Sequence, residues 1–253
     1  MTALILTYHA IEEGPAPLCV APRVFRAHLD AIAGSGAEVL TVSELVERMD
    51  ELPERAVAIT FDDGFRSVVE EAAPLLDARR MPATVFAVAG HLGADNGWPT
   101  QPPNALRRPL ASGAELAALV DEGWEIGSHG LDHAPLTGAA GVLLQRELVT
   151  SRERLEAIVH APVRSYAYPY GALPGPEGRL AVEHEYAAAC TTELGGVQNG
   201  ADPHALPRLE VHYVRRPDLL GRALDGSLTT YLNARRLGAR ARRMIRRDYA
   251  KST

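Results

Sequence analysis

The chain has 253 residues, 46% of them hydrophobic and 23% charged, which is typical of a soluble globular protein that buries a large core without covalent staples. The formal net charge of -6 excludes nucleic-acid binding driven by overall charge. The two cysteines, Cys19 and Cys190, could pair, but two in a chain of this size do not indicate a disulfide scaffold.

The N-terminus does not resemble a signal peptide. It has no basic segment, and its short apolar run, Ala3 to Leu6, leads straight into polar residues. The sequence also contains no apolar run long enough to span a bilayer. For a chain that has not been trimmed, we therefore expect a cytoplasmic protein.

Short apolar runs alternate with helical patterns along the chain. In the first half the patterns predict, in order, a strand over Ala3 to Tyr8, a helix over Phe25 to Ala33, a helix capped by Ser43 and running to Met49, a strand over Val57 to Phe61, a helix over Phe65 to Arg79 and a strand over Ala83 to Val88. The next segment, Gly90 to Pro109, is rich in Gly, Pro and Asn and predicts a loop over one end of the fold.

The second half continues the alternation. It predicts a helix that starts at a capping box of Ser112 and Glu115 and ends near Gly123, a strand over Glu125 to Ser128, a long helix over Val142 to Val159, and strands over Arg164 to Tyr168, Ala187 to Thr191 and Leu209 to Tyr213. This repetition indicates a mainly parallel sheet. Because six or seven such units close more easily than they stay open, we predict an α/β fold, a distorted β/α barrel of about seven parallel strands. An open doubly wound sheet is the alternative.

We assign residues 1–226 to this single barrel domain and residues 227–253 to a basic C-terminal tail. From Ala234 to Lys251 the tail carries eight basic side chains and one acid, Asp248, and its pattern predicts a helix. The favoured interpretation is a helix packed on the barrel with its arginines in solvent. The alternative is contact with an anionic membrane surface or an acidic partner.

Several polar residues directly follow predicted strands. Asp62 and Asp63 follow one strand, His129 follows another, and His9 follows the first. In parallel β/α barrels the catalytic groups gather at the carboxyl ends of the strands, so we expect these side chains to lie close together.

His129 and His133 are four residues apart, a spacing that places two imidazoles on one face of a helical turn, where they can bind one metal ion. A carboxylate from another strand would complete a His, His, Asp set and leave a position open for water, as catalytic zinc requires. The alternative is a pair of surface histidines that flank a turn.

Two adjacent carboxylates need different roles. One of Asp62 and Asp63 can hold the metal while the other takes a proton from the attacking water. The alternative is a polar turn in which one aspartate caps the next helix.

Other residues could contact the substrate. His9 could protonate a leaving amine because its ordinary pKa lies near neutrality, and His212, at the end of the last predicted strand, is its rival. Aromatic faces for a sugar ring could come from Trp98, Tyr168 and Tyr170, whereas Trp124 precedes a strand and is expected in the core.

Four segments together resemble the polysaccharide deacetylase family, also called the NodB-homology domain or carbohydrate esterase family 4. Thr60 to Gly64 (TFDDG) is similar to the family's first motif, Ser128 to His133 (SHGLDH) to its metal-binding motif, and Tyr168 to Gly171 (YPYG) to its third. The opening Leu6 to His9 (LTYH) and the run from Leu52 to Phe86 resemble a branch with rearranged strand order.

The resemblance implies a distorted β/α barrel, a divalent metal that is usually zinc, and hydrolysis of an N-acetyl group on a glycan. It further implies that Asp62 is the general base, that Asp63, His129 and His133 are the metal ligands, and that the backbone N–H of Tyr170 helps to hold the oxyanion.

The family's acid histidine lies in a Leu-x-x-His motif, which both His9 and His212 fit. His9 is preferred because the rearranged branch carries this residue on its first strand. Two other activities stay open: hydrolysis of a different C–N amide bond at the same metal site, and an inactive barrel that binds a glycan or a partner.

The sequence departs from the family at two positions. Gly130 stands where the family usually has Ser or Thr, which removes a supporting hydroxyl. Ala167 stands where many members have the arginine that orients the catalytic aspartate, and Arg164 lies three residues earlier.

Overall fold

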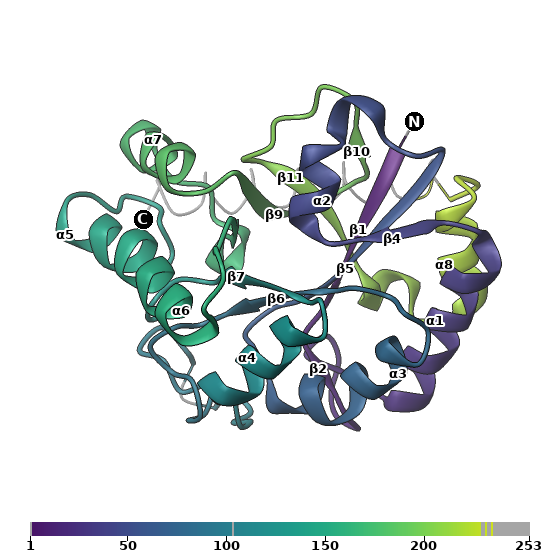
Figure 1. Ribbon diagram of the computed structural model, residues 1–253, viewed down its shortest axis with the longest axis horizontal. Helices are drawn as coiled ribbons and strands as arrows, with labels where there is room; N and C mark the ends of the chain where they lie inside the picture. The colour runs from purple at the N-terminus through teal and green to yellow at the C-terminus, as the bar shows by residue number, and fades with distance from the viewer. Residues whose placement is uncertain (1, 103, 229–230, 232–233, 235–253) are drawn as a thin grey trace, which may run out of the picture.

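The computed structural model describes residues 2–102, 104–228, 231 and 234. Seven parallel strands form a closed barrel in a single domain, with bounds and order β1 (Thr2–Tyr8), β5 (Arg55–Phe61), β6 (Thr84–Ala87), β7 (Glu125–Ser128), β8 (Ser165–Ala167), β9 (Ala188–Leu194) and β11 (Leu206–Glu210) (Figure 1). The first strand closes the barrel because it pairs in parallel with both β5 and β11. The predicted barrel is confirmed, and the open sheet is excluded.

The pairing of β1 with β5 is the longest continuous register in the barrel, running from Thr2 opposite Arg55 to Tyr8 opposite Phe61. It continues past the strand ends, since the N–H of Asp62 donates to the carbonyl of Tyr8 at 2.9 Å. The residues that follow these two strands are therefore held at one level of the barrel.

Short strands extend the sheet at its edges. They are β4 (Glu38–Leu40), parallel to β5, β10 (Val197–Gln198), antiparallel to β1, and the separate pair β2 (Ala10–Ile11) and β3 (Cys19–Val20). Both cysteines are buried and free, so the possible disulfide between Cys19 and Cys190 does not form.

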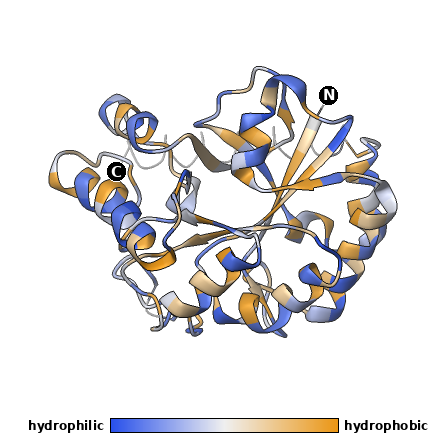
Figure 2. Ribbon diagram, in the orientation of Figure 1, coloured by the Kyte–Doolittle hydropathy of each residue, from blue (hydrophilic) through white to orange (hydrophobic). Residues whose placement is uncertain are grey.

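Helices surround the strands (Figure 1). Their bounds are α1 (Pro22–Ser35), α2 (Val42–Glu47), α3 (Ala73–Asp77), α4 (Gly113–Asp121), α5 (Val142–Leu144), α6 (Ser151–Val159), α7 (Pro176–Glu185) and α8 (Pro217–Leu224). They carry hydrophobic and hydrophilic stripes, whereas most of β1 has hydrophobic colours (Figure 2). The core therefore lies between the strands and the inner faces of the helices.

Helix α1 shows how sequence fixes such an element. Phe25, Leu29 and Ile32 recur at helical spacing and are fully buried. The helix ends at Gly36, whose φ of 68° is a left-handed conformation that glycine adopts without a steric cost. The predicted core position of Trp124 is also confirmed, because its ring stacks on Phe61 and is 4% exposed.

Some predicted boundaries are wrong. Helix α2 is capped by Thr41, which shares a capping box with Glu44, because the N–H and hydroxyl of Ser43 both donate to Glu125 instead. The last barrel strand lies three residues earlier than predicted, since residues 211–214 form a 3₁₀ turn.

Two predicted helices contain π-helical turns. The segment predicted from Phe65 to Arg79 becomes helical after Phe65, which instead forms a bridge to Leu110, and it contains a π-helical turn at Val68–Ala72 before α3. The segment from Val142 to Val159 is helical throughout, as predicted, with a π-helical turn at Gln145–Thr150 between α5 and α6.

Residues 235–253 lie outside the described part of the chain, so the helix and the contacts predicted for the basic tail stay predictions. In the described part, no helix combines the length and the apolar character that a membrane span requires.

Glu125 joins three other elements at the end of the barrel where β6, β7 and β8 begin. Its carboxylate accepts hydrogen bonds from the N–H and hydroxyl of Ser43, from Thr84 and from Ser165, at 2.6–3.0 Å. We expect Glu125→Ala to lower the free energy of unfolding by about 2 kcal/mol, because it leaves these donors without an acceptor. Urea unfolding measures the loss, and the exposed Glu54→Ala serves as control; equal effects of the two substitutions would contradict the assignment.

Candidate active site

Residues from different strands meet at the carboxyl end of the barrel. Asp62 and Asp63 follow β5, His9 follows β1, and His129 follows β7. Asp62, Asp63, His129 and His133 are all buried, at 3–6% exposure. The expected convergence of these side chains is therefore present, and its burial separates their charges from bulk water.

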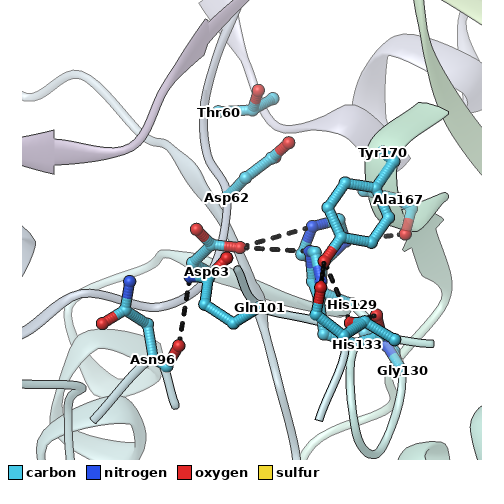
Figure 3. Close-up of polar contacts among 12 residues, drawn as sticks. Thr60, Asp62, Asp63, Asn96, Gln101, His129, Gly130, His133, Ala167 and Tyr170 are labelled. Atoms are coloured by element: carbon cyan, nitrogen blue, oxygen red, sulfur yellow. Dashed lines mark hydrogen bonds and ion pairs between the residues drawn. The ribbon is translucent and has the colours of Figure 1, made fainter. Parts of the chain in front are cut away.

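Asp63, His129 and His133 point their ligand atoms at a common point (Figure 3). Oδ1 of Asp63 lies 3.6 Å from Nε2 of His129 and 3.5 Å from Nε2 of His133, and the ligand atoms of all three lie within 4.8 Å of one another. Two nitrogen or oxygen ligands of a tetrahedral zinc, each about 2.0–2.1 Å from the ion, are roughly 3.4 Å apart. The donor set and its spacing thus fit a divalent metal ion held by three protein ligands.

The two histidines do not lie on a helical turn, so that part of the prediction is wrong. Residues 129–134 form a loop in which Gly130 and His133 have φ values of 85° and 54°. Asp63 also has a left-handed backbone, with φ of 72°, and Gly64 follows it at 78°. These conformations are costly for residues with a Cβ, and here they turn the ligand side chains toward each other.

Neighbouring groups fix the orientation and protonation of the imidazoles. Nδ1 of His129 lies 2.7 Å from the carbonyl of Ala167; with the hydrogen on Nδ1, this bond leaves the lone pair of Nε2 free for a metal. His133 lies between Trp98 and Tyr170, with ring centroids at 4.3 Å and 4.6 Å. Burial, with the nearby His129, lowers the pKa of His133 to about 2, so its imidazole is neutral and can act as a ligand.

Asp62 forms a buried ion pair with Arg208 of β11. The guanidinium donates to both carboxylate oxygens, at 2.6 Å and 2.7 Å, and its Nε donates to the carbonyl of Thr191 at 2.9 Å. Burial alone raises the pKa of Asp62, but Arg208, helped by His129 and His9, holds that pKa well below its usual range. Asp62 is therefore a fixed carboxylate anion.

Sequence reasoning missed Arg208. The predicted last strand begins at Leu209, whereas β11 begins at Leu206, so the prediction leaves Arg208 outside the sheet. The resemblance to the family places its arginine at the position of Ala167 instead. Arg164 does not substitute for it, because Arg164 is exposed and pairs with Glu47 at 2.9 Å. The sequence does contain one sign of this residue, because Arg208 lies between Leu206 and Leu209 in a run that is otherwise apolar.

Glu210, at the end of β11, was also missed. Burial alone lowers the pKa of His9, but the carboxylates of Glu210, Asp63 and Asp62 raise it above its ordinary value. Among the described residues, neither Nδ1 of His9 nor Oε1 of Glu210 has a hydrogen-bond partner, although both atoms are buried. His9 is thus a histidine that favours its protonated form at the site, with one ring nitrogen available.

His212, the rival of His9, lies elsewhere. It is exposed in the 3₁₀ turn after β11, where its ring packs against Tyr213 at 4.4 Å. The predicted strand ran too far along the chain, which is why His212 appeared to end it.

The prediction of aromatic faces for a sugar at Trp98 and Tyr168 is wrong for this structure. Trp98 is 2% exposed because its ring is packed against His133, and Tyr168 is fully buried with its hydroxyl donating to the carbonyl of His204. Tyr170 is instead half exposed, and its hydroxyl lies 2.9 Å from that of Thr100 in the loop over the site. Its backbone is left-handed, with φ of 60°.

The structure is thus a closed β/α barrel with a buried Asp-His-His centre that could hold a divalent metal at the carboxyl ends of its strands. Comparison with known sequences gives the family: residues 49–189 match the polysaccharide deacetylase family, and the chain belongs to it.

The chain is 28% identical to YxkH of Bacillus subtilis over 210 residues, 82% of this chain and 70% of that one. It is 24% identical to the poly-β-1,6-N-acetyl-D-glucosamine N-deacetylase of Staphylococcus epidermidis over 203 residues, 76% of this chain and 68% of that one. Among solved structures, IcaB from Ammonifex degensii has the same fold, with a TM-score of 0.73 at 22% identity over 88% of this chain and 96% of that one.

Replacement of Arg208 tests the buried ion pair. We expect Arg208→Met to lower the free energy of unfolding by about 3–5 kcal/mol, because it leaves a buried carboxylate without its cation. Arg164→Met, which removes an exposed arginine, should have little effect. Denaturant unfolding of both variants measures the difference, and similar stabilities would show that Arg208 does not hold Asp62.

Proposed function

We propose that the protein hydrolyses the N-acetyl group of an N-acetylated amino sugar or glycan and releases acetate and a free amine. Membership of the polysaccharide deacetylase family supports this activity. The observation that carries it is the buried centre of Asp63, His129 and His133 beside an ionised Asp62. This arrangement supports Asp63 as a metal ligand and Asp62 as a proton acceptor, the two roles that a metal-assisted amide hydrolysis needs.

We assign zinc to the three-ligand centre, on the strength of its nitrogen and oxygen donors and their spacing. When bound, such an ion supplies Lewis acidity to the acetyl carbonyl and acidifies the water that attacks it. The geometry supports Asp63, His129 and His133 as the residues that hold it.

Asp62 takes the proton of the attacking water in this proposal. An ionised carboxylate has about four lone-pair sites, so the two bonds from Arg208 leave sites free to accept that proton. The guanidinium also fixes the rotation of the carboxylate, which keeps the free sites directed at one place. The backbone N–H of Tyr170 donates to the negative charge that develops on the acetyl oxygen.

His9 protonates the departing nitrogen. The surrounding carboxylates raise its pKa, which keeps the ring protonated near neutral pH and able to donate. Its position at the end of β1, next to the strand that carries both aspartates, supports this role over that of the exposed His212.

The relatives suggest the first substrates to try. The Staphylococcus epidermidis enzyme is named for a polymer of N-acetylglucosamine, so oligomers of that sugar are the reasonable test. A hydrolase of another C–N amide would use the same centre, and an inactive barrel would bind its ligand without releasing acetate.

Metal content and acetate release test the centre together. We expect about one zinc per chain in the parent protein, and the loss of both zinc and acetate release in Asp63→Ala and His133→Ala. The exposed His184→Ala, on α7, should leave both unchanged. Elemental analysis and acetate assays on N-acetylglucosamine oligomers supply the two readouts.

The outcomes separate the alternatives. Zinc without acetate release would keep the centre and direct the search to other amides. Neither zinc nor activity, even after zinc is added back, would overturn the enzyme assignment and leave a binding protein.

Replacement of the two histidine candidates tests the acid. We expect His9→Ala to lower the rate of acetate release by about 10²–10⁴-fold with zinc content unchanged, because a general acid contributes about that much. His212→Ala should retain the parent rate. The reverse pattern would transfer the role to His212.

A further inference from the structure

The loop that joins the two metal-site histidines rests on one buried carboxylate. Glu147, in the π-helical turn Gln145–Thr150, is 1% exposed. Its carboxylate accepts backbone N–H bonds from Leu131 at 3.0 Å, from Asp132 at 3.2 Å and from Ala134 at 3.3 Å. These three donors lie between or directly after the histidines, so a single side chain holds the whole loop.

Gly130 provides the space for this carboxylate. A Cβ built on Gly130 would lie 2.4 Å from Oε2 of Glu147, so the carboxylate would have to move away from the N–H groups that it accepts. The φ of Gly130, 85°, is also one that L residues rarely adopt. The glycine at this position is thus matched to Glu147, both in space and in backbone conformation.

We propose that Glu147 is the positioning residue of the metal centre and that Gly130 is required to admit its carboxylate. The inference rests on the proposed metal site of Asp63, His129 and His133. It adds a residue from outside the recognisable motifs that sets where the second histidine stands.

The backbone of the loop is strained at His133. His133 has a left-handed backbone with φ of 54°, a conformation that costs free energy and persists only where its surroundings impose it. The bond from the N–H of Ala134 fixes the peptide that follows His133. The bond from the N–H of Asp132 fixes the peptide between Leu131 and Asp132. Without them the loop can relax toward ordinary conformations, which moves Nε2 of His133 away from Asp63.

The support of Glu147 is itself rigid. The hydroxyl of Ser151 donates to the carbonyl of Glu147 at 2.6 Å and lies 2.9 Å from the hydroxyl of Ser128, which in turn accepts the N–H of Gly130 at 3.2 Å. These hydrogen bonds connect the helical residues Glu147 and Ser151 to the start of the loop at Gly130.

Metal affinity distinguishes a positioning role from a merely structural one. We expect Glu147→Ala to weaken Co²⁺ binding by about 10–100-fold, the usual effect of removing a group that orients a ligand. Competition with a chelator measures the dissociation constant, and the visible spectrum of Co²⁺ reports the coordination. Glu153→Ala, an exposed glutamate two residues into α6, is the matched control and should bind Co²⁺ as the parent does.

Two further variants keep the proposal falsifiable if Glu147→Ala fails to fold. Glu147→Gln retains one acceptor oxygen and should weaken binding in the same direction by a smaller factor. Gly130→Ser should weaken binding more in the parent than in the Glu147→Ala background, because the clash with the carboxylate is absent there.

The results separate this inference from the proposed function. If the parent binds Co²⁺ and the Glu147 variants bind it equally well while their melting temperatures fall, Glu147 is structural only and the inference is wrong. If the parent itself binds no Co²⁺ or Zn²⁺, the metal centre and this inference fail together.

Discussion

The buried pair of Asp62 and Arg208 is the interaction on which the site depends. A carboxylate removed from water costs several kcal/mol unless a cation is placed against it, and Arg208 supplies that cation with two parallel hydrogen bonds. The pair joins β5 to β11, strands that both flank β1 but are not paired with each other. The pair therefore holds the two strands together at the mouth of the barrel. It also means that Asp62, and not the adjacent Asp63, is paired with Arg208.

Backbone geometry then separates the two aspartates. Asp62 continues the register of β5 and accepts two hydrogen bonds from Arg208. Asp63 has a left-handed backbone and points toward the histidines (Figure 3). Two neighbouring carboxylates in one extended strand would point to opposite faces and could not share a site. The left-handed turn at Asp63 resolves this, and Gly64 makes the turn possible because it continues the left-handed path.

Local sequence patterns predict much of the barrel, but they do not predict contacts between residues that are far apart in the chain. Strands such as β1 and β5 are buried on both faces, so their continuous apolar runs mark them clearly. The partner of Asp62 could not be found in this way, because Arg208 is 146 residues away and reaches Asp62 only through closure of the barrel.

The histidine pair shows the same limit. The prediction that His129 and His133 lie close together is correct, but the predicted helical turn is not present. A loop held by Glu147 brings the two residues together. The burial of Trp98 likewise depends on how the long loop packs over His133, which no local pattern encodes.

Negatively charged groups outnumber positively charged groups at the mouth of the barrel. Asp62, Asp63 and Glu210 face Arg208 and His9, so three carboxylates stand against two groups that can be cationic. Arg208 pairs with Asp62. Burial raises the pKa of Asp63 and of Glu210, and the nearby His9 lowers both pKa values but does not cancel the effect of burial. In the proposed function, a divalent cation held by Asp63 would supply the missing charge and would change the net charge of the mouth from negative to positive. A net positive charge stabilises an oxyanion as it forms, so the excess of carboxylates that would favour metal binding also supports the proposed amide hydrolysis.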